Sequence, residues 1–233
     1  MNRLRETSGK EERLQGPVGR RGLIAGAVGL PLLLSVPALP ARAAGSSTMD
    51  VTGWRLPSLS FTMTDADTGR VVTARDFRGK LVLLYFGYTN CPDVCPLTLH
   101  NIALILHRLG KEAAGVQPLF VTVDPHRDTL AVLRRYTHLF SPEIVGLRGT
   151  ADQLAALARS YHIGYSVSPA TASHPYEVTH SSAIYVFDAR GRARLLIPSL
   201  ASTTPDIAGT TADLERLLGV GHDGALARLG RLL

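Results

Sequence analysis

The chain has 233 residues, enough for one folded domain with extensions, and a formal net charge of +6 at pH 7. Residues 1–43 hold seven Lys and Arg and three acidic residues, so the rest of the chain has a net charge of only +2. A nearly balanced surface gives no reason to expect nucleic-acid binding, which needs a basic stripe.

The first 43 residues have the pattern of an export signal. A polar stretch ends in Arg20-Arg21, an apolar run extends from Gly22 to about Leu39, and small residues precede a cut before Ala44. The paired arginines suggest the twin-arginine variant of such a signal. We expect a protein exported to the periplasm or the outer face of the cytoplasmic membrane, with an uncut membrane anchor as the alternative.

Residues 44–54 have the composition of a linker, and we expect residues 55–220 to form one domain followed by a tail at 221–233. The turn signal at Asp65–Gly69 predicts an N-terminal β-hairpin of residues 60–64 and 71–73. The run 81–86 is continuously apolar, as in a strand buried on both faces.

A helix is predicted from near Pro96 to Gly110, because Leu99, Ile102, Leu106 and Leu109 share one helical face. After it we expect a buried strand at 119–123, a helix capped by Asp128 and running to His138, and a helix opened by the capping box of Thr150 and Gln153. A long loop at 162–179 and two paired strands at 182–187 and 193–197 should follow. The last helix is opened by Thr204-Pro205 or, if Gly209 delays it, by Thr211.

This order of elements predicts an α/β sandwich of the thioredoxin type, in which helices flank a central mixed sheet. The reactive edge of such a fold is the turn after the first central strand. Cys91 and Cys95, the two cysteines of the chain, lie in that turn. Cys95 also lies at a helix N-terminus, where the helix dipole favours a thiolate.

The spacing of the two cysteines leaves three interpretations open. A structural disulfide would close a very short loop and would therefore stabilise the fold only weakly. A redox pair of the thioredoxin type normally has two intervening residues, and here there are three. A soft metal site is the third interpretation, and it needs another ligand because two thiolates are an incomplete site.

His180 is the strongest candidate for that ligand among the eight histidines. It precedes the predicted strand at 182–187, and a side chain at the mouth of a strand can reach the cysteine turn. A histidine bonded locally at a strand end is the alternative, and His174 is the main rival as a ligand. The remaining histidines are expected on surfaces or in loops: His100, His107, His126, His138, His162 and His222.

Three segments together resemble the Sco/SenC family of copper-binding assembly proteins. They are Phe-Gly-Tyr-Thr-Asn-Cys-Pro-Asp-Val-Cys-Pro at 86–96, Thr-Val-Asp-Pro-His-Arg-Asp-Thr at 122–129 and Tyr-Glu-Val-Thr-His-Ser-Ser at 176–182. The resemblance covers about residues 55–220. One departure is Thr179, which stands where the family usually has an acid before the histidine.

The resemblance implies that Cys91, Cys95 and His180 bind copper as Cu(I) or Cu(II), and that Asp124 shapes the site or the docking face. Thr179 is expected to alter the contacts that hold the imidazole. An ordinary strand-to-helix loop is the alternative for the Asp124 segment.

The implied function is a copper chaperone that builds the dinuclear copper centre of cytochrome c oxidase. Its expected partner is the copper-bearing oxidase subunit, with other copper chaperones or thiol reductases as further partners. A thiol–disulfide oxidoreductase is the alternative, and a peroxidase of the peroxiredoxin type is a weaker one.

Overall fold

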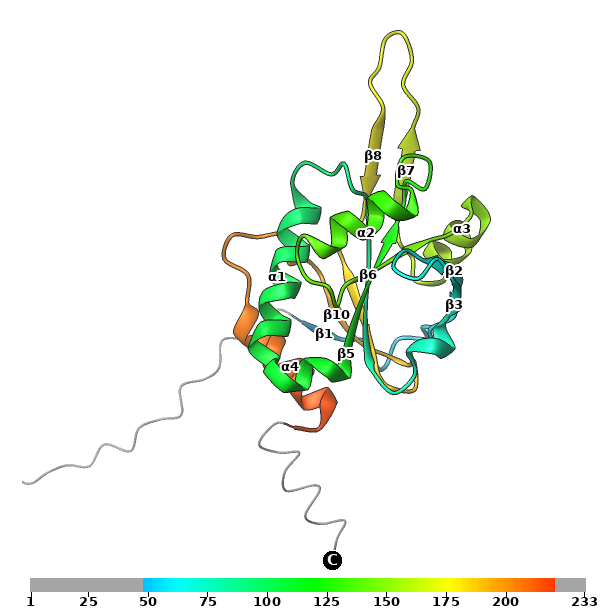
Figure 1. Cartoon of the computed structure of the whole chain (residues 1–233). Helices are drawn as coiled ribbons and strands as arrows, with labels where there is room; N and C mark the ends of the chain where they lie inside the picture. The colour runs from blue at the N-terminus through cyan, green and yellow to red at the C-terminus, as the bar shows by residue number, and fades with distance from the viewer. Residues whose placement is uncertain (1–47, 221–233) are drawn as a thin grey trace, which may run out of the picture. The chain divides into compact units, whose positions relative to one another are not determined.

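The computed structural model describes residues 48–220 (Figure 1). The predicted export signal at 1–43 and the predicted tail at 221–233 lie outside the described residues. Within 48–220, no helix is both long enough and apolar enough to span a membrane.

One eight-stranded mixed sheet forms the centre of the described part, with the strand order β1-β10-β9-β4-β5-β6-β2-β3. The central strands β4, β5 and β6 are parallel, and every other pairing in this sheet is antiparallel. In sheet order the strands are β1 (Met49–Asp50), β10 (Ala193–Ile197), β9 (Ile184–Phe187), β4 (Leu81–Gly87), β5 (Val116–Thr122), β6 (Val145–Arg148), β2 (Thr62–Asp65) and β3 (Val71–Thr73).

Helices cover the sheet and complete the predicted α/β, thioredoxin-like architecture, which is confirmed. All seven residues of β4 and all seven of β5 are buried, as a parallel strand covered on both faces requires. Helix α1 packs against α4, and α2 packs against β6. The helices are α1 (Val94–Leu109), α2 (Leu130–His138), α3 (Ala151–Ser160) and α4 (Ile207–Leu218), with short 3₁₀ turns η1 (Ala74–Phe77) and η2 (Gly110–Gly115).

The helix caps confirm one prediction and correct two. The capping box of Thr150 and Gln153 opens α3 as expected. Helix α2 is capped by Thr129 and not by Asp128, since the Thr129 hydroxyl accepts the N–H of Val132 at 3.3 Å. Helix α4 begins at Ile207 because the Asp206 side chain accepts the N–H of Gly209 at 2.7 Å, so the glycine belongs to the cap and does not delay the helix.

The predicted long loop at 162–179 is wrong on both sides of its middle, at residues 165–168 and 177–179. Two antiparallel strands, β7 (Tyr165–Ser168) and β8 (Glu177–His180), form a separate hairpin that projects beyond the sheet (Figure 1). Proline and serine at the tip of this hairpin give a loop-like composition, and most of its residues are exposed, so the sequence shows little of the alternation that indicates a half-buried strand. Strands β6 and β1 were also not predicted, and β1 with the buried Val51 shows that the predicted linker at 44–54 belongs in part to the folded domain.

Candidate metal centre

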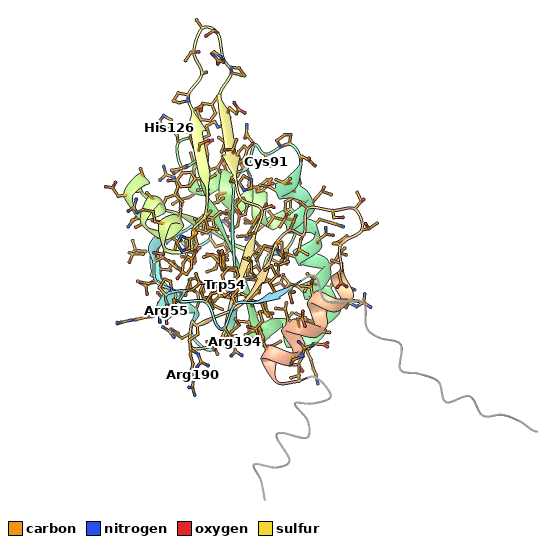
Figure 2. The ribbon with its side chains drawn as sticks, turned by 180° about the vertical axis from the view of Figure 1, so that it is seen from behind. Trp54, Arg55, Cys91, His126, Arg190 and Arg194 are labelled. Atoms are coloured by element: carbon orange, nitrogen blue, oxygen red, sulfur yellow. The ribbon has the colours of Figure 1, made fainter. Side chains whose placement is uncertain are left out.

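The two cysteines lie in the turn that leads from β4 into α1, at the hairpin end of the domain (Figure 2). Cys91 is 9 % exposed and Cys95, in the first turn of α1, is fully buried. Both are free thiols. The backbone N–H of Cys95 points at Cys91 Sγ, with 3.5 Å between the nitrogen and the sulfur.

His180, the last residue of β8, reaches this turn. Its Nε2 lies 3.2 Å from Cys95 Sγ, and the ligand atoms of Cys91, Cys95 and His180 all lie within 4.8 Å of one another. Within residues 48–220 no other group of three Cys, His, Asp or Glu side chains converges in this way. The structure therefore brings together the three predicted ligands, and their binding of a metal remains a prediction.

The imidazole of His180 is held in the orientation that a ligand needs. Its Nδ1 lies 2.9 Å from the carbonyl oxygen of Ser181, and a carbonyl can only accept, so Nδ1 carries the proton. Nε2 is then left with its lone pair toward the sulfurs, the state in which histidine binds metals. The ring edge contacts of Tyr88 and Tyr85, at 5.7 and 6.1 Å between ring centroids, restrict its rotation further.

Thr179 does not contact the imidazole, which corrects its predicted effect on His180. Neighbouring residues of a strand point to opposite faces. The exposed Thr179 hydroxyl accordingly lies across the hairpin, 2.8 Å from that of Ser166. The partner of the imidazole is the carbonyl of Ser181, and a backbone group leaves no trace in the amino-acid pattern.

Within residues 48–220, no other histidine joins the two thiols, and His222 lies outside the described residues. The rival candidate His174 is exposed near the tip of the hairpin, where Nδ1 lies 2.9 Å from the hydroxyl of Ser173. His138 lies 2.8 Å from a carboxylate oxygen of Asp67. His100 and His107 are exposed on α1, as predicted.

The two sulfurs differ in protonation, in the opposite sense to the prediction. A hydrogen bond from the Cys95 thiol, together with hydrogen bonds from the backbone N–H groups of Asp93 and Cys95, holds the pKa of Cys91 far below its ordinary value. The same hydrogen bond and burial raise the pKa of Cys95. The N-terminal N–H of α1 points at Cys91, so the helix stabilises the thiolate of Cys91 and not that of Cys95.

Tyr85 and Gly87, at the end of β4, were not predicted to belong to the site. The Tyr85 hydroxyl lies 3.6 Å from Cys95 Sγ, with the geometry of a donor. A Cβ on Gly87 would stand 2.8 Å from Cys95 Sγ and 2.5 Å from a ring carbon of Phe120, so only glycine lets the strand pass this close to the sulfur. A glycine that ends a buried strand four residues before the first cysteine is the sequence signal that could have identified this position.

Replacing Gly87 by alanine should therefore displace the Cys95 sulfur. We expect Gly87→Ala to lower the free energy of unfolding by about 1–3 kcal/mol, because the added methyl overpacks a closed part of the core. Gly164→Ala is the matched control, since nothing lies within 4 Å of a Cβ built there. Urea unfolding measures both, and equal, small effects of the two changes would contradict the close contact.

Asp124 is almost fully buried in the loop after β5 and does not touch the thiols. It forms an ion pair with Arg127 and accepts a hydrogen bond from the Tyr176 hydroxyl at 2.8 Å. The Arg127 guanidinium lies over the ring of Tyr176, 4.0 Å from its centroid, and 5.9 Å from that of Tyr88. Asp124 thus joins its loop to the hairpin that carries His180, through the hydroxyl of Tyr176.

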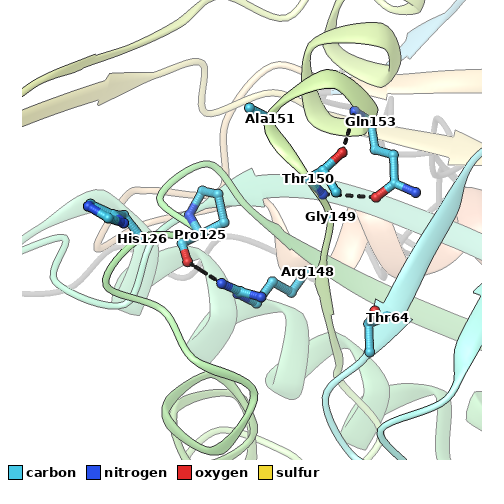
Figure 3. Close-up of a pocket in the computed structure, with 8 residues that line it drawn as sticks. All are labelled: Thr64, Pro125, His126, Arg148, Gly149, Thr150, Ala151 and Gln153. Atoms are coloured by element: carbon cyan, nitrogen blue, oxygen red, sulfur yellow. Dashed lines mark hydrogen bonds between the residues drawn. The ribbon is translucent and has the colours of Figure 1, made fainter.

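The same loop is fixed from its other side by Arg148, which donates two hydrogen bonds to the carbonyl of Pro125, at 2.8 and 3.2 Å (Figure 3). His126 lies exposed on the rim of the pocket beside this contact. This exposure, outside the cysteine turn, agrees with its predicted place in a strand-to-helix loop.

Asp128 ties the cysteine turn to the sheet. Its buried carboxylate accepts the backbone N–H of Thr89 at 3.1 Å, the Thr89 hydroxyl at 2.6 Å and the Thr122 hydroxyl at 2.6 Å. Thr89 stands two residues before Cys91, and Thr122 ends β5. Asp128, predicted as a helix cap, therefore fixes the position of the segment that carries Cys91 by hydrogen bonds.

Comparison with known proteins identifies the family. Residues 56–217 match the family model described as SCO1/SenC. The chain is 47 % identical over 125 residues to the mitochondrial protein SCO2 homolog of Bos taurus, a match that covers 53 % of this chain and 47 % of the relative. It is 39 % identical over 126 residues to mitochondrial SCO1 of Saccharomyces cerevisiae, covering 53 % and 43 %. The chain thus spans about half the length of these curated relatives.

Solved structures agree with this assignment. ScoI of Bradyrhizobium japonicum, a structure with copper bound, has a TM-score of 0.61 and 36 % identity, covering 69 % of this chain and 98 % of that one. Yeast Sco1 with copper bound has a TM-score of 0.59 and 34 % identity, covering 69 % and 88 %. With the family model matching well over half of its length, this chain belongs to the SCO1/SenC family.

Proposed function

We propose that this protein binds one copper ion through Cys91, Cys95 and His180 and delivers it to another protein. The observation that carries the proposal is the convergence of two sulfurs and a ring nitrogen within 4.8 Å. Thiolates are soft donors that suit Cu(I), and the imidazole allows the same site to accept Cu(II). The copper-bound structures of two relatives support this choice of metal.

The arrangement suits transfer better than storage. Three protein ligands leave a coordination position open, through which an acceptor can share the metal before the donor releases it. Cys91 lies at the accessible side of the site, and Cys95 is enclosed by Tyr85 and the end of β4. Cys91, which is 9 % exposed against 0 % for Cys95, is therefore the first of the two sulfurs that an incoming acceptor meets.

The acceptor we propose is the copper-bearing subunit of cytochrome c oxidase, whose dinuclear copper centre the protein would help to assemble. The family resemblance of the three sequence segments supports this partner. The export pattern of residues 1–43 supports an encounter in the periplasm or at the outer face of the cytoplasmic membrane. Other copper chaperones and thiol reductases are proposed as further partners that load or reduce the site.

Oxidation to a Cys91–Cys95 disulfide should abolish copper binding, and reduction should restore it. A disulfide offers no anionic sulfur ligand, so a site that depends on both thiolates cannot form. Copper content per chain is measured by atomic absorption after gel filtration of oxidised, reduced and re-reduced protein. One tightly bound copper ion per fully oxidised chain would contradict the proposal.

A thiol–disulfide oxidoreductase is the second candidate, favoured by the contrast between the two thiols. The environment of Cys91, the less buried of the two, favours a thiolate and that of Cys95 favours a thiol, which is the arrangement of an attacking and a resolving cysteine. The His180→Ala variant distinguishes the two functions, because copper binding needs the imidazole and disulfide reduction by the two thiols does not. Rapid reduction of a disulfide substrate by this variant, free of copper, would favour the oxidoreductase.

Replacing Thr179 by aspartate tests how the imidazole is held. Because the Thr179 side chain points toward Ser166, we expect Thr179→Asp to change the Cu(II) affinity by less than the ~10-fold that a direct contact to a ligating histidine produces. Competition against a Cu(II) chelator measures the affinity. A tenfold or larger gain would show that residue 179 does act on His180.

A further inference from the structure

Arginines and one tryptophan gather at the end of the sheet that lies away from the cysteines. Figure 2 shows Trp54, Arg55, Arg190 and Arg194 at this end and Cys91 toward the other. We call this surface the basic face and define it by Trp54, Arg55, Arg78, Arg190, Arg192 and Arg194.

The sheet topology brings these residues together from three parts of the chain. Arg78 comes shortly before β4, and Arg190 and Arg192 lie in the turn between β9 and β10. Strands β4 and β9 are antiparallel, so the start of one meets the end of the other, and the Arg78 guanidinium lies 3.1 Å from where a Cβ on Gly191 would stand. Trp54 follows β1, which pairs with β10.

The basic face is exposed and only partly neutralised. Asp188 binds Arg192 at 2.8 Å and Arg194 at 3.4 Å. Arg55, Arg78 and Arg190 are exposed and form no ion pair with any residue of the range 48–220. Three uncompensated cations on a domain whose charge is otherwise nearly balanced form a local positive surface.

Trp54 adds an apolar element to this surface. Its side chain is 47 % exposed, and with Leu56, Arg192 and Arg194 it lines a hollow of about 540 Å³. An amphipathic ring next to guanidinium groups is the combination found where proteins meet the headgroup region of a membrane. Arginines there pair with lipid phosphates, while the indole sits at the level of the headgroups.

We propose that the basic face docks this domain onto the surface of an anionic lipid bilayer. Each basic residue near such a surface contributes to binding through the negative surface potential. A nucleic acid fits less well, because the rest of the domain supplies no continuous basic stripe. The proposal goes beyond copper transfer and does not depend on it, since copper-free protein should dock equally well.

Docking by this face would direct the metal centre away from the bilayer. Strand β4 runs from the basic face to the cysteine turn, and its seven residues span ~20 Å. The cysteine turn and the hairpin with His180 would then face the extramembrane part of a membrane-bound acceptor. The orientation would be set by the fold of residues 48–220, independently of the segment before it.

Trp54 is the single tryptophan of the chain, so its fluorescence reports on the basic face directly. The full chain is mixed with vesicles that contain brominated lipids, either phosphatidylglycerol with phosphatidylcholine or phosphatidylcholine alone. We expect a blue shift and bromine quenching of Trp54 only with the anionic vesicles. About 1 M salt, where the Debye length is ~3 Å, should reverse both changes.

Charge variants decide whether the arginines cause the docking. Arg55→Gln, Arg78→Gln and Arg190→Gln together should lower the ratio of docked to free domain on the order of 100-fold. The matched control combines Arg108→Gln, Arg135→Gln and Arg159→Gln, which remove the same charge from exposed positions on α1, α2 and α3. Both triple variants keep residues 1–47, so any lipid contact of that segment is common to them.

Three results would overturn the proposal. The first is equal quenching of Trp54 in anionic and neutral vesicles, and the second is an equal loss in both triple variants. The third is a Trp54 shift with inorganic phosphate or a short DNA duplex but none with vesicles. A failure of copper binding leaves all of these readouts unchanged, so the two proposals are tested separately.

Discussion

Removing the imidazole of His180 should sharply weaken copper binding, most of all as Cu(II). The two thiolates can still hold Cu(I), but Cu(II) needs the nitrogen donor that lies 3.2 Å from Cys95 Sγ. Changes outside the ligand set cost ~10–100-fold in metal affinity, and loss of the ligand itself should exceed that range. Chelator competition with His180→Ala and the visible absorption of the Cu(II) form measure the effect.

His174→Ala is the control for this experiment, because His174 lies exposed on the same hairpin and contacts Ser173. We expect it to bind Cu(II) like the unchanged protein. Thiol titration should give two free thiols in both variants, which shows that the cysteine turn is intact. An unchanged Cu(II) spectrum and affinity in His180→Ala would refute the assignment of this ligand.

Removing the carboxylate of Asp128 should destabilise the fold by about 3 kcal/mol, because it leaves two donors of the half-buried Thr89 and the buried hydroxyl of Thr122 without their acceptor. The effect should extend to the metal centre, since Thr89 stands two residues before Cys91. Urea unfolding of Asp128→Ala measures the first effect, and copper affinity at low urea the second.

A double-mutant cycle with Thr89→Ala shows whether Asp128 acts through the cysteine turn. If it does, the double variant loses less stability than the two single changes together, because the same hydrogen bonds are removed in each. Asp128→Asn keeps one acceptor oxygen and should be intermediate. Strictly additive effects would mean that Asp128 and Thr89 stabilise the protein independently.

The amino-acid sequence by itself was enough to predict the central elements of the fold. Strand β4 and residues 119–121 of β5 are buried on both faces and form continuous apolar runs, while α1 places Leu99, Leu106 and Leu109 on one face. These signals are local, since they depend on periods of two or 3.6 residues. The hairpin β7–β8 has no such signal, because it pairs outside the main sheet and is largely exposed.

The same distinction applies to the site. Cys91, Cys95 and His180 could be named from the sequence because their residue types carry the chemistry and their segments resemble those of a family. The roles of Asp128, Thr179 and Gly87 could not be predicted in this way. Asp128 binds Thr89, which lies 39 positions away in the sequence. Thr179 points away from the imidazole because of the face of β8 on which it lies. Gly87 matters because the sulfur of Cys95 packs against the end of β4. Local chemistry is encoded in residue types and short spacings, whereas contacts between distant segments exist only once the sheet has set their register.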